Sequence, residues 1–488
     1  MNTQGVMGKP PYAMIAILFV GAFVSLLNET LLNVALPSIM KEFEVSASAV
    51  QWLSTGYMLV NGILIPASAF FIQKFTNRSL FIAAMILFTA GSVLAALSPS
   101  FSVLLAARMI QASGSAIMMP LLMNVMLASF PVERRGAAMG IFGLVMITAP
   151  AIGPTLSGWL IEHYTWRTLF EVVIPIAAIT LVFAVFKLKN ITQQRAISLD
   201  ILSLVLSSIG FGGILYGFSS AGEKGWDSVY VYGAITAGVI GLVLFVLRQM
   251  KLDEPLLEFR IYKYPMFALS SAISIVIAMA MFSAMLLMPI YVQTIRGISP
   301  LDSGLLMLPG AIVMGIMSPI TGMLFDKFGA RVLAVIGLSI TILTTFMFSN
   351  LTMDTSYGYI MFVYTLRMFG MSMVMMPVMT NGLNQLPPAM NPHGTAMNNT
   401  LQQVSGAVGS ALLVTLMQNR TESQAEQLAQ SAAGDPTAMA NVMNEAMLHG
   451  INFSFTVSVF IAAVALILAF FMKRVTPAGQ AAKQKSAG

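Results

Sequence analysis

The sequence has few charged residues and no cysteine. Asp, Glu, Lys and Arg make up 9% of its 488 residues, whereas a soluble globular domain has about 25%. So few charges could not cover the surface of a soluble protein of this length, which excludes a cytosolic enzyme, a disordered chain and a nucleic-acid-binding domain. The lack of cysteine excludes disulfide bonds and thiolate metal sites. The three histidines lie far apart in the sequence, so no metal site is predicted.

A nucleotide-binding loop is also missing. The pattern GxxxxGK[ST], whose backbone holds the phosphates of ATP, does not occur in the sequence. No polar stretch is long enough to form a separate catalytic domain. We therefore expect that the protein is not an enzyme, that ATP does not drive its activity, and that it binds no cofactor.

Hydrophobic residues are abundant instead. They make up 57% of the chain, and the mean hydropathy of +0.83 indicates a polytopic membrane protein. A helix that crosses a bilayer needs about 20 mostly apolar residues. Fourteen segments meet this requirement: 13–36, 50–72, 79–98, 102–129, 137–161, 167–187, 199–220, 228–248, 265–293, 303–324, 331–350, 357–383, 394–419 and 449–473. The first is too long for the core of a signal peptide, so we expect it to be retained. Without the least secure pair, 199–220 and 228–248, the count would be twelve.

The positions of Lys and Arg predict the orientation in the membrane. With the N-terminus inside, 18 of the 25 basic residues lie in inside segments and five in outside segments, while Arg108 and Arg367 fall within spans. Cytoplasmic loops carry the excess of positive charge in membrane proteins. We therefore predict that both termini are cytoplasmic, and we assign the net charge of +6 to topology rather than to a nucleic-acid partner.

Two stretches of the chain are related to each other. Residues 66–78 (PASAFFIQKFTNR) and 319–331 (PITGMLFDKFGAR) both fit P-x7-K-F-x2-R at an offset of 253 residues. A weaker pair begins at Arg108 and Arg367, at an offset of 259. Internal repeats are typical of secondary transporters, whose substrate site lies between the repeats near the midplane. We predict two six-helix halves, 1–198 and 265–488, with an inserted helix pair and linker at 199–264.

Short motifs lie at the ends of these spans and within them. A loop motif, G-x-L-x-D-[RK]-x-G-x-[RK], is complete in the second half, at Gly322, Leu324, Asp326, Lys327, Gly329 and Arg331. The first-half copy keeps Lys74 and Arg78 but has Gln73 in place of the acid. A fourth-helix pattern matches Arg108, Gln111 and Gly114. A fifth-helix pattern, G-P-x-x-x-G, matches Gly153, Pro154 and Gly158, with Pro150 just before it.

Together these motifs resemble those of the major facilitator superfamily, and more narrowly its fourteen-helix drug:proton antiporter branch. The resemblance implies an all-α fold of two six-helix halves plus two inserted helices. It also implies a monomer in a bacterial plasma membrane that exports small amphipathic or cationic drugs by alternating access, driven by the proton gradient. Within that scheme the loop motifs act as gates, and the Gly-Pro segment seals the halves against leak and favours exchange.

Glu29, Arg108 and Glu171 are the candidates for proton coupling. An ionisable side chain inside the bilayer costs roughly 3 kcal/mol or more, so it is a functional candidate by default. Glu29 and Arg108 fall at about the same depth, roughly 10–12 Å from the outer boundary, and we expect them to pair. The family's acid stands where this chain has Asn28, so Glu29 is displaced by about 100° around the helix. A static ion pair is the alternative for Glu29 and Arg108, and an interfacial position is the alternative for Glu171.

Five residues are candidates for the cargo site. Trp52 and Tyr57 could stack against a planar or cationic drug. The amides of Asn398 and Gln402 lie four residues apart and share one helix face, and Arg367 falls nearer the midplane. The structural alternative for each is ordinary helix packing. The 39 methionines could re-pack around varied apolar cargo, although most are expected to be packing residues.

Two other functions stay open on the sequence alone. The same fold could export a specific metabolite, amino acid or lipid, and a more remote alternative is a receptor or channel without coupled transport. The polar segment 420–448 is expected to form an amphipathic helix at the membrane surface.

Overall fold

A computed structural model describes residues 11–45, 47–131, 134–191, 194, 200–253, 255–431 and 436–475. These residues form helices and no β-strand. The α-helices are α1 (Tyr12–Phe43), α2 (Ala47–Lys74), α3 (Asn77–Ala96), α4 (Phe101–Ser129), α5 (Arg135–His163), α6 (Thr168–Lys187), α7 (Ile201–Lys224), α8 (Val229–Gln249), α9 (Pro265–Ile290), α10 (Pro300–Phe328), α11 (Ala330–Phe348), α12 (Tyr357–Ser372), α13 (Met375–Gln385), α14 (Asn391–Ser431) and α15 (Pro436–Phe470). Short 3-10 turns (Phe259–Lys263 and Pro388–Met390) and a π-helical turn (Tyr291–Ile295) complete the described part.

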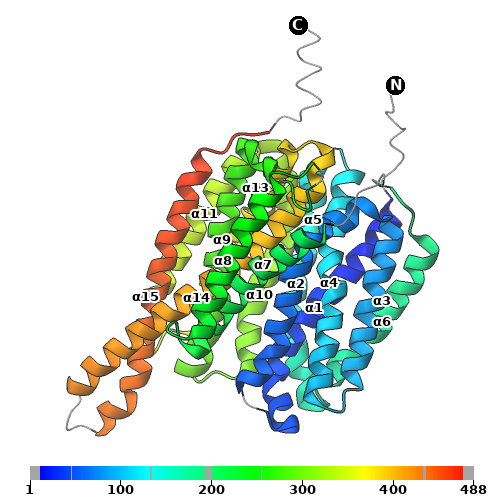
Figure 1. Ribbon diagram of the computed structural model, residues 1–488. Coiled ribbons are helices and arrows are strands. Elements are labelled where there is room, and N and C mark those ends of the chain that lie inside the picture. Colours follow the sequence, from blue (N-terminus) through cyan, green and yellow to red (C-terminus); the bar gives the residue numbers. More distant parts are fainter. Residues whose placement is uncertain are drawn as a thin grey trace.

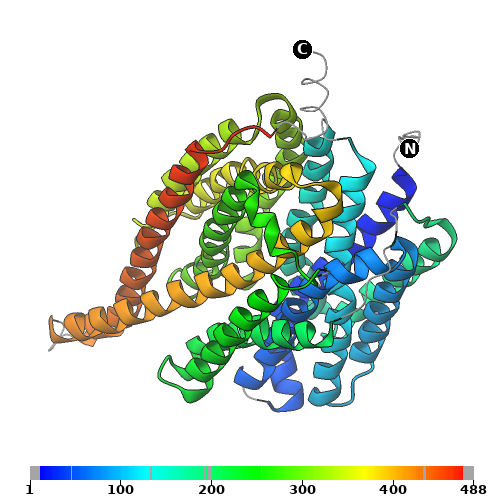
Figure 2. The same ribbon diagram turned by 45° about the horizontal axis from the view of Figure 1, so that its top comes forward.

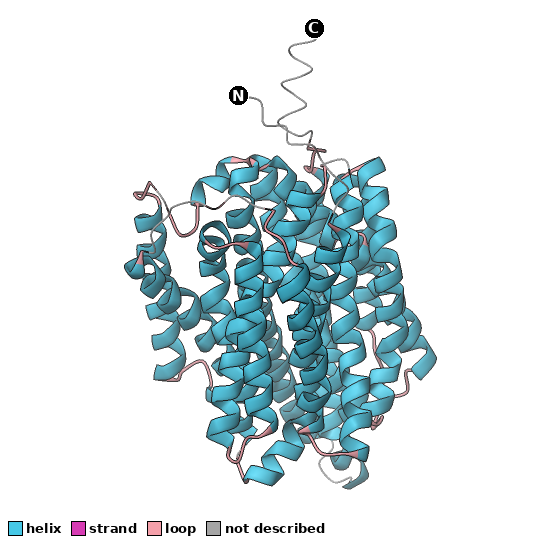
Figure 3. Cartoon of the chain, turned by 90° about the vertical axis from the view of Figure 1, so that its right-hand side faces the viewer, coloured by secondary structure: helices cyan, strands magenta, loops and turns pink. Residues whose placement is uncertain are grey.

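Most helices run between two ends of the molecule (Figure 3). Within the described residues, twelve helical segments are both long and apolar enough to do so. The expected all-helical multi-pass protein is thereby confirmed. Two more helices, α5 and α9, are 29 and 26 residues long, but they are not among the twelve, so the count of fourteen stays a prediction.

Helix α1 begins and α15 ends at the same end of the bundle, at the top of Figure 1. We call this end the terminal face and the opposite end the far face. Successive spans alternate in direction, so α2 and α10 end at the terminal face, while α5 and α14 begin there. Residues that are distant in sequence are thereby brought together at that face.

Helix ends follow local sequence signals. Thr76 caps α3 by accepting a hydrogen bond from the backbone N–H of Ser79 at 3.1 Å. Helix α10 ends at Gly329, whose φ of 80° suits glycine. The predicted span 357–383 is instead two helices, α12 and α13, with a turn at residues 373–374. Pro377 accounts for the break, because it has no N–H to donate to the carbonyl four residues earlier.

The predicted surface helix at 420–448 is not a separate element. Helices α14 and α15 continue through most of this segment as an antiparallel hairpin that projects beyond the bundle (Figures 1 and 2). The residues are rich in Ala, Gln, Glu and Met, all good helix formers, so both helices extend past their apolar spans. The two helices cross tightly, since a Cβ on Gly450 would lie 2.3 Å from the Thr421 hydroxyl.

Two helix pairs join the first six helices to the helices that follow the linker. Helix α5 packs along α10, and α2 packs along α14. We call these contacts the α5–α10 seam and the α2–α14 seam. Helix α7 packs against both α2 and α14, while α8 packs against α7, so the inserted pair lies beside the α2–α14 seam (Figure 1).

Candidate functional site

Arg108, on α4, is fully buried at the centre of a polar cluster. Its Nη1 donates to Asn28 Oδ1 at 2.7 Å and to Gln111 Oε1 at 2.5 Å. Gln111 Nε2 in turn donates to Ser92 Oγ at 2.8 Å. The guanidinium carbon lies 4.2 Å from the centre of the Tyr57 ring, within cation–π range. Within the described chain, every direct contact of this buried charge is therefore with a neutral group from α1, α2 or α4.

Glu29 is half-buried on α1 and does not form the expected ion pair with Arg108. Ion pairs within 4 Å among the described residues join Arg167 to Glu42, Arg248 to Asp200 and Arg260 to Glu258. Asn28 contacts Arg108 instead, because neighbouring positions of a helix point about 100° apart. Glu29 is nevertheless close enough for an electrostatic interaction with Arg108.

Helix α5 holds the turn of α1 that carries Glu29. A Cβ on Gly153 would lie 2.2 Å from the Thr30 hydroxyl, so only glycine permits this approach. Ser157 Oγ donates to the Leu31 carbonyl at 2.6 Å. The predicted antiporter segment is thus packed against the residue that follows the candidate proton carrier.

The other members of that segment are placed differently. A Cβ on Gly158 would meet nothing within 4 Å among the described residues, so this glycine has no comparable packing role. Pro150 and Pro154 lie within α5, and their side chains fall outside the described part of the structure.

The α5–α10 seam is tightest at the terminal face. A Cβ on Gly322 would lie 2.2 Å from the Gly136 carbonyl oxygen, and one on Gly140 would lie 2.4 Å from the Ser318 carbonyl oxygen. Ser318 Oγ donates to the Gly140 carbonyl at 2.6 Å. Small residues allow the two backbones to touch here, as is common where membrane helices pack closely.

Toward the far face the same seam is looser. A Cβ on Gly315 would lie 3.8 Å from the Thr148 hydroxyl, and one on Gly304 would lie 3.3 Å from the Thr155 hydroxyl. The first would be an ordinary van der Waals contact and the second a tight one, whereas those at the terminal face would be clashes. The seam is therefore closed at the terminal face and relaxes away from it.

Asp326 links the two sides of the α5–α10 seam. Its Oδ1 and Oδ2 accept hydrogen bonds from the backbone N–H groups of Gly136 and Ala137, each at 3.0 Å. These N–H groups lie at the first turn of α5, which has no other helical acceptor for them, and the positive end of the helix dipole favours a carboxylate. Arg474 Nη2 also donates to the Asp326 carbonyl at 2.6 Å.

The rest of the second-half loop motif surrounds this contact. Gly322 provides the close approach to α5, and Gly329 makes the turn after α10. Lys327 and Arg331 are exposed. Of the residues in the motif, Asp326 is the one whose side chain bonds across the seam.

The α2–α14 seam is held at the equivalent place by an amide and an imidazole. Gln73 Nε2 lies 3.0 Å from His393 Nε2 near the start of α14, and both residues are buried. The backbone N–H of Glu258 donates to His393 Nδ1 at 3.3 Å. Sequence analysis missed His393; its position just after Pro392 at the start of a predicted span was the one available signal.

The two basic residues of the first-half loop do not reach across this seam. Arg78 Nη2 donates to the Val185 carbonyl of α6 at 2.7 Å, and Lys74 lies 5.2 Å from the centre of the Phe70 ring on its own helix. Both side chains stay within the first half, and both are exposed.

Arg367, on α12, is the counterpart of Arg108 in the second half. It is 1% exposed, and its Nη1 donates to Thr345 Oγ1 at 2.5 Å while Nη2 donates to the Ala280 carbonyl at 3.2 Å. Thr345 follows Ser92 by 253 residues, the offset of the loop motifs. Arg367 thus joins the first and third helices of its half directly, whereas Arg108 bonds the first helix and reaches the third through Gln111. Neither arginine has a carboxylate within 4 Å among the described residues.

The remaining predicted residues are not gathered in one place. Trp52 packs on Tyr216 of α7, with ring centres 5.5 Å apart, so it faces the inserted pair. Tyr57 is fully buried under Arg108. Glu171 is exposed on the first turn of α6 and forms no ion pair with another described residue.

The amide residues predicted on the penultimate span belong to α14. Asn398 is buried, and its Oδ1 accepts a long hydrogen bond of 3.5 Å from Ser271 on α9. Gln402 is half-buried one turn further along. They lie on the part of α14 that packs against α9.

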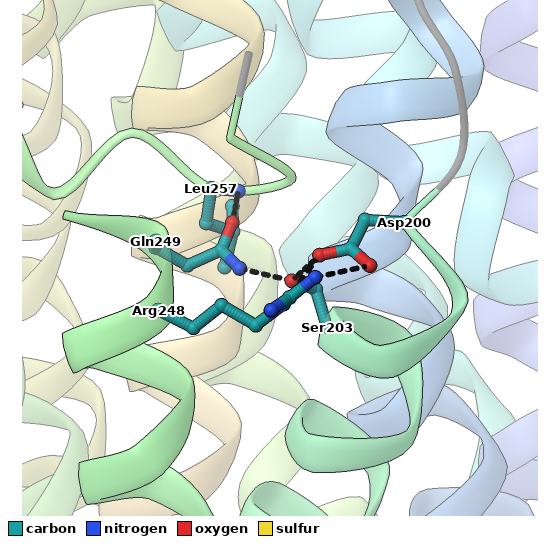
Figure 4. A network of polar contacts seen from close by, with 5 residues as sticks. All are labelled: Asp200, Ser203, Arg248, Gln249 and Leu257. Carbon is teal, nitrogen blue, oxygen red and sulfur yellow. Dashed lines mark hydrogen bonds and ion pairs between the residues drawn. The ribbon is translucent and has the colours of Figure 1, made fainter. Parts of the chain in front are cut away.

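A polar network fixes the inserted pair at the terminal face (Figure 4). Arg248 at the end of α8 donates to both carboxylate oxygens of Asp200, at 2.7 and 3.0 Å, and it lowers the pKa of Asp200 to about 2. Gln249 bonds Ser203 on α7 and accepts from the backbone N–H of Leu257 at 3.3 Å. The network therefore joins α7, α8 and the linker.

Helix α7 is also attached to its two larger neighbours. A Cβ on Gly62 of α2 would lie 2.0 Å from Leu215 Cδ1 of α7, a very close approach. Near the far face, Trp226 Nε1 donates to Thr415 Oγ1 of α14 at 2.7 Å. The inserted pair thus contacts one member of each half.

Known proteins resemble this chain in sequence over most of its length. The sequence profile of the Major Facilitator Superfamily matches residues 18–198 and 192–410. The chain is 51% identical over 445 residues to the uncharacterized MFS-type transporter YhcA of Bacillus subtilis, covering 90% of this chain and 84% of that protein. It is 44% identical over 472 residues to the lincomycin resistance protein LmrB of the same organism, covering 95% of each.

A solved structure shares the fold. The human organic anion transporter MFSD10 (TETRAN) has a TM-score of 0.64 against this chain at 13% identity, over 93% of this chain and 100% of that one. At this identity the likeness concerns the arrangement of helices alone.

Proposed function

The chain belongs to the major facilitator superfamily, and from this premise we propose that it exports small amphipathic or cationic drugs in exchange for protons. Export proceeds by alternating access across a bacterial plasma membrane, with fourteen spans and both termini in the cytoplasm. The relative that is a lincomycin resistance protein supports a drug as cargo. The distribution of Lys and Arg supports a cytoplasmic terminal face.

The observation that carries this proposal is a buried arginine whose direct partners are all neutral. Arg108 has no exposed surface and bonds Asn28 and Gln111. An unpaired charge in this position is costly, and Glu29, one residue from Asn28, is the described acid that interacts with it electrostatically. Protonating or deprotonating Glu29 therefore changes the net charge of the cluster between +1 and 0.

Helix α5 provides the connection from that charge to the seam. It touches α1 at Thr30 through Gly153 and touches α10 through Gly136 and Gly140. A shift of α1 that follows the protonation of Glu29 is therefore passed to the same helix that lines the α5–α10 seam. We infer that proton release and the opening of the terminal face are coupled through α5.

Transport by purified protein in liposomes tests the proposal. With an imposed pH gradient, wild-type protein should drive several unrelated drugs uphill, including lincomycin and tetraphenylphosphonium. Glu29→Gln cannot ionise and should abolish pH-driven transport per folded molecule while retaining drug binding. Glu171→Gln makes the same chemical change at an exposed acid on α6 and should behave as wild type.

Each part of the proposal would be contradicted by a different result. Full pH-driven activity of folded Glu29→Gln contradicts its role as proton carrier, and loss of activity in Glu171→Gln moves that role to α6. If only one compound of the panel is transported, the protein is a specific exporter of the same fold. No uphill movement of any compound refutes coupled transport.

A further inference from the structure

The inserted pair and its linker are bonded to α14 at both ends of the molecule. At the far face, Trp226 in the turn between α7 and α8 donates from Nε1 to Thr415 Oγ1 at 2.7 Å. At the terminal face, the backbone N–H of Glu258, in the linker after α8, donates to His393 Nδ1 at 3.3 Å. Thr415 follows His393 by 22 residues, which corresponds to about 33 Å along a helix. One unit of the chain therefore holds α14 at two well-separated levels.

The same unit is packed against α2. The rings of Trp52 on α2 and Tyr216 on α7 have centres 5.5 Å apart. Further along α2, a Cβ on Gly62 would lie 2.0 Å from Leu215 Cδ1 of α7, and glycine permits this approach because it has no side chain. Helix α7 is thus in contact with α2 and α14 at the same time.

The far-face turn of the inserted pair is itself held in place by aromatic contacts. The rings of Phe218 and Trp226 have centres 5.6 Å apart. Lys224 Nζ donates to the Tyr216 hydroxyl at 3.1 Å and lies 5.0 Å from the centre of the Tyr230 ring. The residue that bonds α14 is therefore fixed to the part of α7 that contacts α2.

The linker is fixed to the inserted pair by the polar network at the terminal face (Figure 4). Arg248 of α8 bonds Asp200, which precedes α7, and Gln249 accepts from the backbone N–H of Leu257 in the linker. Leu257 is fully buried. The contact between Glu258 and α14 is therefore made by a segment whose position α7 and α8 determine.

The α5–α10 seam is built differently. The inserted pair packs along α2 and α14, and among the described helices it does not pack along α5 or α10. The α5–α10 seam is bonded at the terminal face, where Asp326 accepts from the start of α5, and its packing at Gly304 and Gly315 is looser toward the far face. At the far face, α5 and α10 can separate without breaking any of the contacts of the inserted pair described above.

Separation of α2 from α14 has a different effect, because α7 lies against both helices. It would break the hydrogen bond between Trp226 and Thr415 or pull α7 away from α2. Alternating access requires the halves to separate, so this step rests on the proposed function. We infer that the inserted pair makes the α2–α14 seam a hinge, tied at the far face by the bond between Trp226 and Thr415, and that the far face opens at the α5–α10 seam.

Two pairs of spin labels at the far face test this inference by double electron–electron resonance in liposomes. The chain has no cysteine, so labels can be attached specifically at exposed positions. Glu162→Cys on α5 with Leu301→Cys on α10 spans one seam, and Glu44→Cys before α2 with Gln418→Cys on α14 spans the other. Addition of tetraphenylphosphonium, or a change of pH, should shift the distances of the first pair and leave those of the second pair unchanged.

Substitutions at the tie distinguish its hydrogen bond from ordinary packing. Trp226→Phe keeps an aromatic ring but removes the N–H donor, and Thr415→Val removes the acceptor with little change of shape. Either should raise the population of longer distances in the α2–α14 pair about two- to tenfold. The double variant should do no more than one single variant, because both changes remove the same bond.

Two control variants accompany these changes. Thr415→Ser keeps the hydroxyl and should leave both label pairs as in the wild type. Trp159→Phe makes the same change as Trp226→Phe at an exposed tryptophan of α5, whose ring contacts in the described chain are with His163 and Tyr164 nearby in sequence. It should leave both label pairs unchanged as well.

The inference and the proposed function would fail in different ways. Equal shifts of the two pairs in the wild type overturn the hinge. A folded Trp226→Phe protein with wild-type α2–α14 distances overturns the tie, and so do additive effects of Trp226→Phe and Thr415→Val. No shift at either pair contradicts alternating access together with the inference. If both pairs behave as expected but the purified protein moves no drug uphill, the proposed function alone is refuted.

Discussion

Asp326→Asn is expected to destabilise the arrangement in which the α5–α10 seam is closed at the terminal face, and the size of this effect can be calculated. The carboxylate accepts two backbone hydrogen bonds at 3.0 Å from the start of α5. Asn keeps one acceptor oxygen and presents an NH2 group to the second N–H, so one charge-assisted bond becomes neutral and the other is lost. Hydrogen bonds to charged groups contribute about 1.5–3 kcal/mol, and neutral ones about 1 kcal/mol.

The net loss is about 2–5 kcal/mol, because two charge-assisted bonds are replaced by one neutral bond. At 1.4 kcal/mol per factor of ten, the closed arrangement becomes roughly 30- to 4,000-fold less favoured relative to the open one. If the closed state predominates by less than that factor in the wild type, the variant is mostly open at the terminal face.

A pair of spin labels, one on each half, measures this shift from the closed to the open arrangement. The chain has no cysteine, so Arg134→Cys before α5 and Lys473→Cys after α15 can be labelled specifically, and both positions are exposed. The distances between the two spin labels, measured by double electron–electron resonance, should become longer in Asp326→Asn. Transport should fall strongly while the protein remains in the membrane. Asp302→Asn makes the same change at the exposed far end of α10 and should leave the distances unchanged. A wild-type distance distribution in Asp326→Asn would refute the account of this contact.

Two further substitutions test other contacts. Gly153→Ala places a Cβ 2.2 Å from the Thr30 hydroxyl, whereas Gly158→Ala meets nothing within 4 Å. Overpacking of about 1–3 kcal/mol should therefore abolish most proton-driven flux in the first variant and spare the second; equal loss in both would contradict the packing argument. Arg248 lowers the pKa of Asp200 to about 2, so the pair stabilises the folded protein fully above the unfolded pKa of about 3.9 and loses this contribution as the pH falls through 2. Asp200→Asn should lower stability at pH 7 by about 1 kcal/mol, given that Arg248 is partly exposed, and the difference from wild type in thermal unfolding should narrow below pH 4.

The sequence predicted the helices and the family because both leave strong local signals. Long apolar segments, basic loops and the complete motif at 322–331 are visible without any knowledge of contacts. The profile match confirms the family. The same local reasoning failed at residues 420–448, because charge and polarity mark the end of an apolar span but do not end a helix.

Contacts between the halves could not be predicted in the same way. Asp326 was identified as the charged member of the second loop, but its partner lies 190 residues earlier at the start of α5. The expected Glu29–Arg108 pair was wrong because depth along a helix does not specify direction around it, and Asn28 is the residue that points at Arg108. His393 carried no motif at all.

The inserted pair has a consequence for how the molecule meets lipid. Helix α7 lies against both members of the α2–α14 seam, so acyl chains are kept from that line of contact. The α5–α10 seam has no such cover in the described chain: Ile141 on α5 and Ile312, Ile316 and Met323 on α10 are 47%, 51%, 61% and 57% exposed. Two seams that the internal repeat makes equivalent are thereby made unequal. Bilayer thickness and lateral pressure act directly on one of them, and a compound dissolved among the acyl chains meets one seam rather than two.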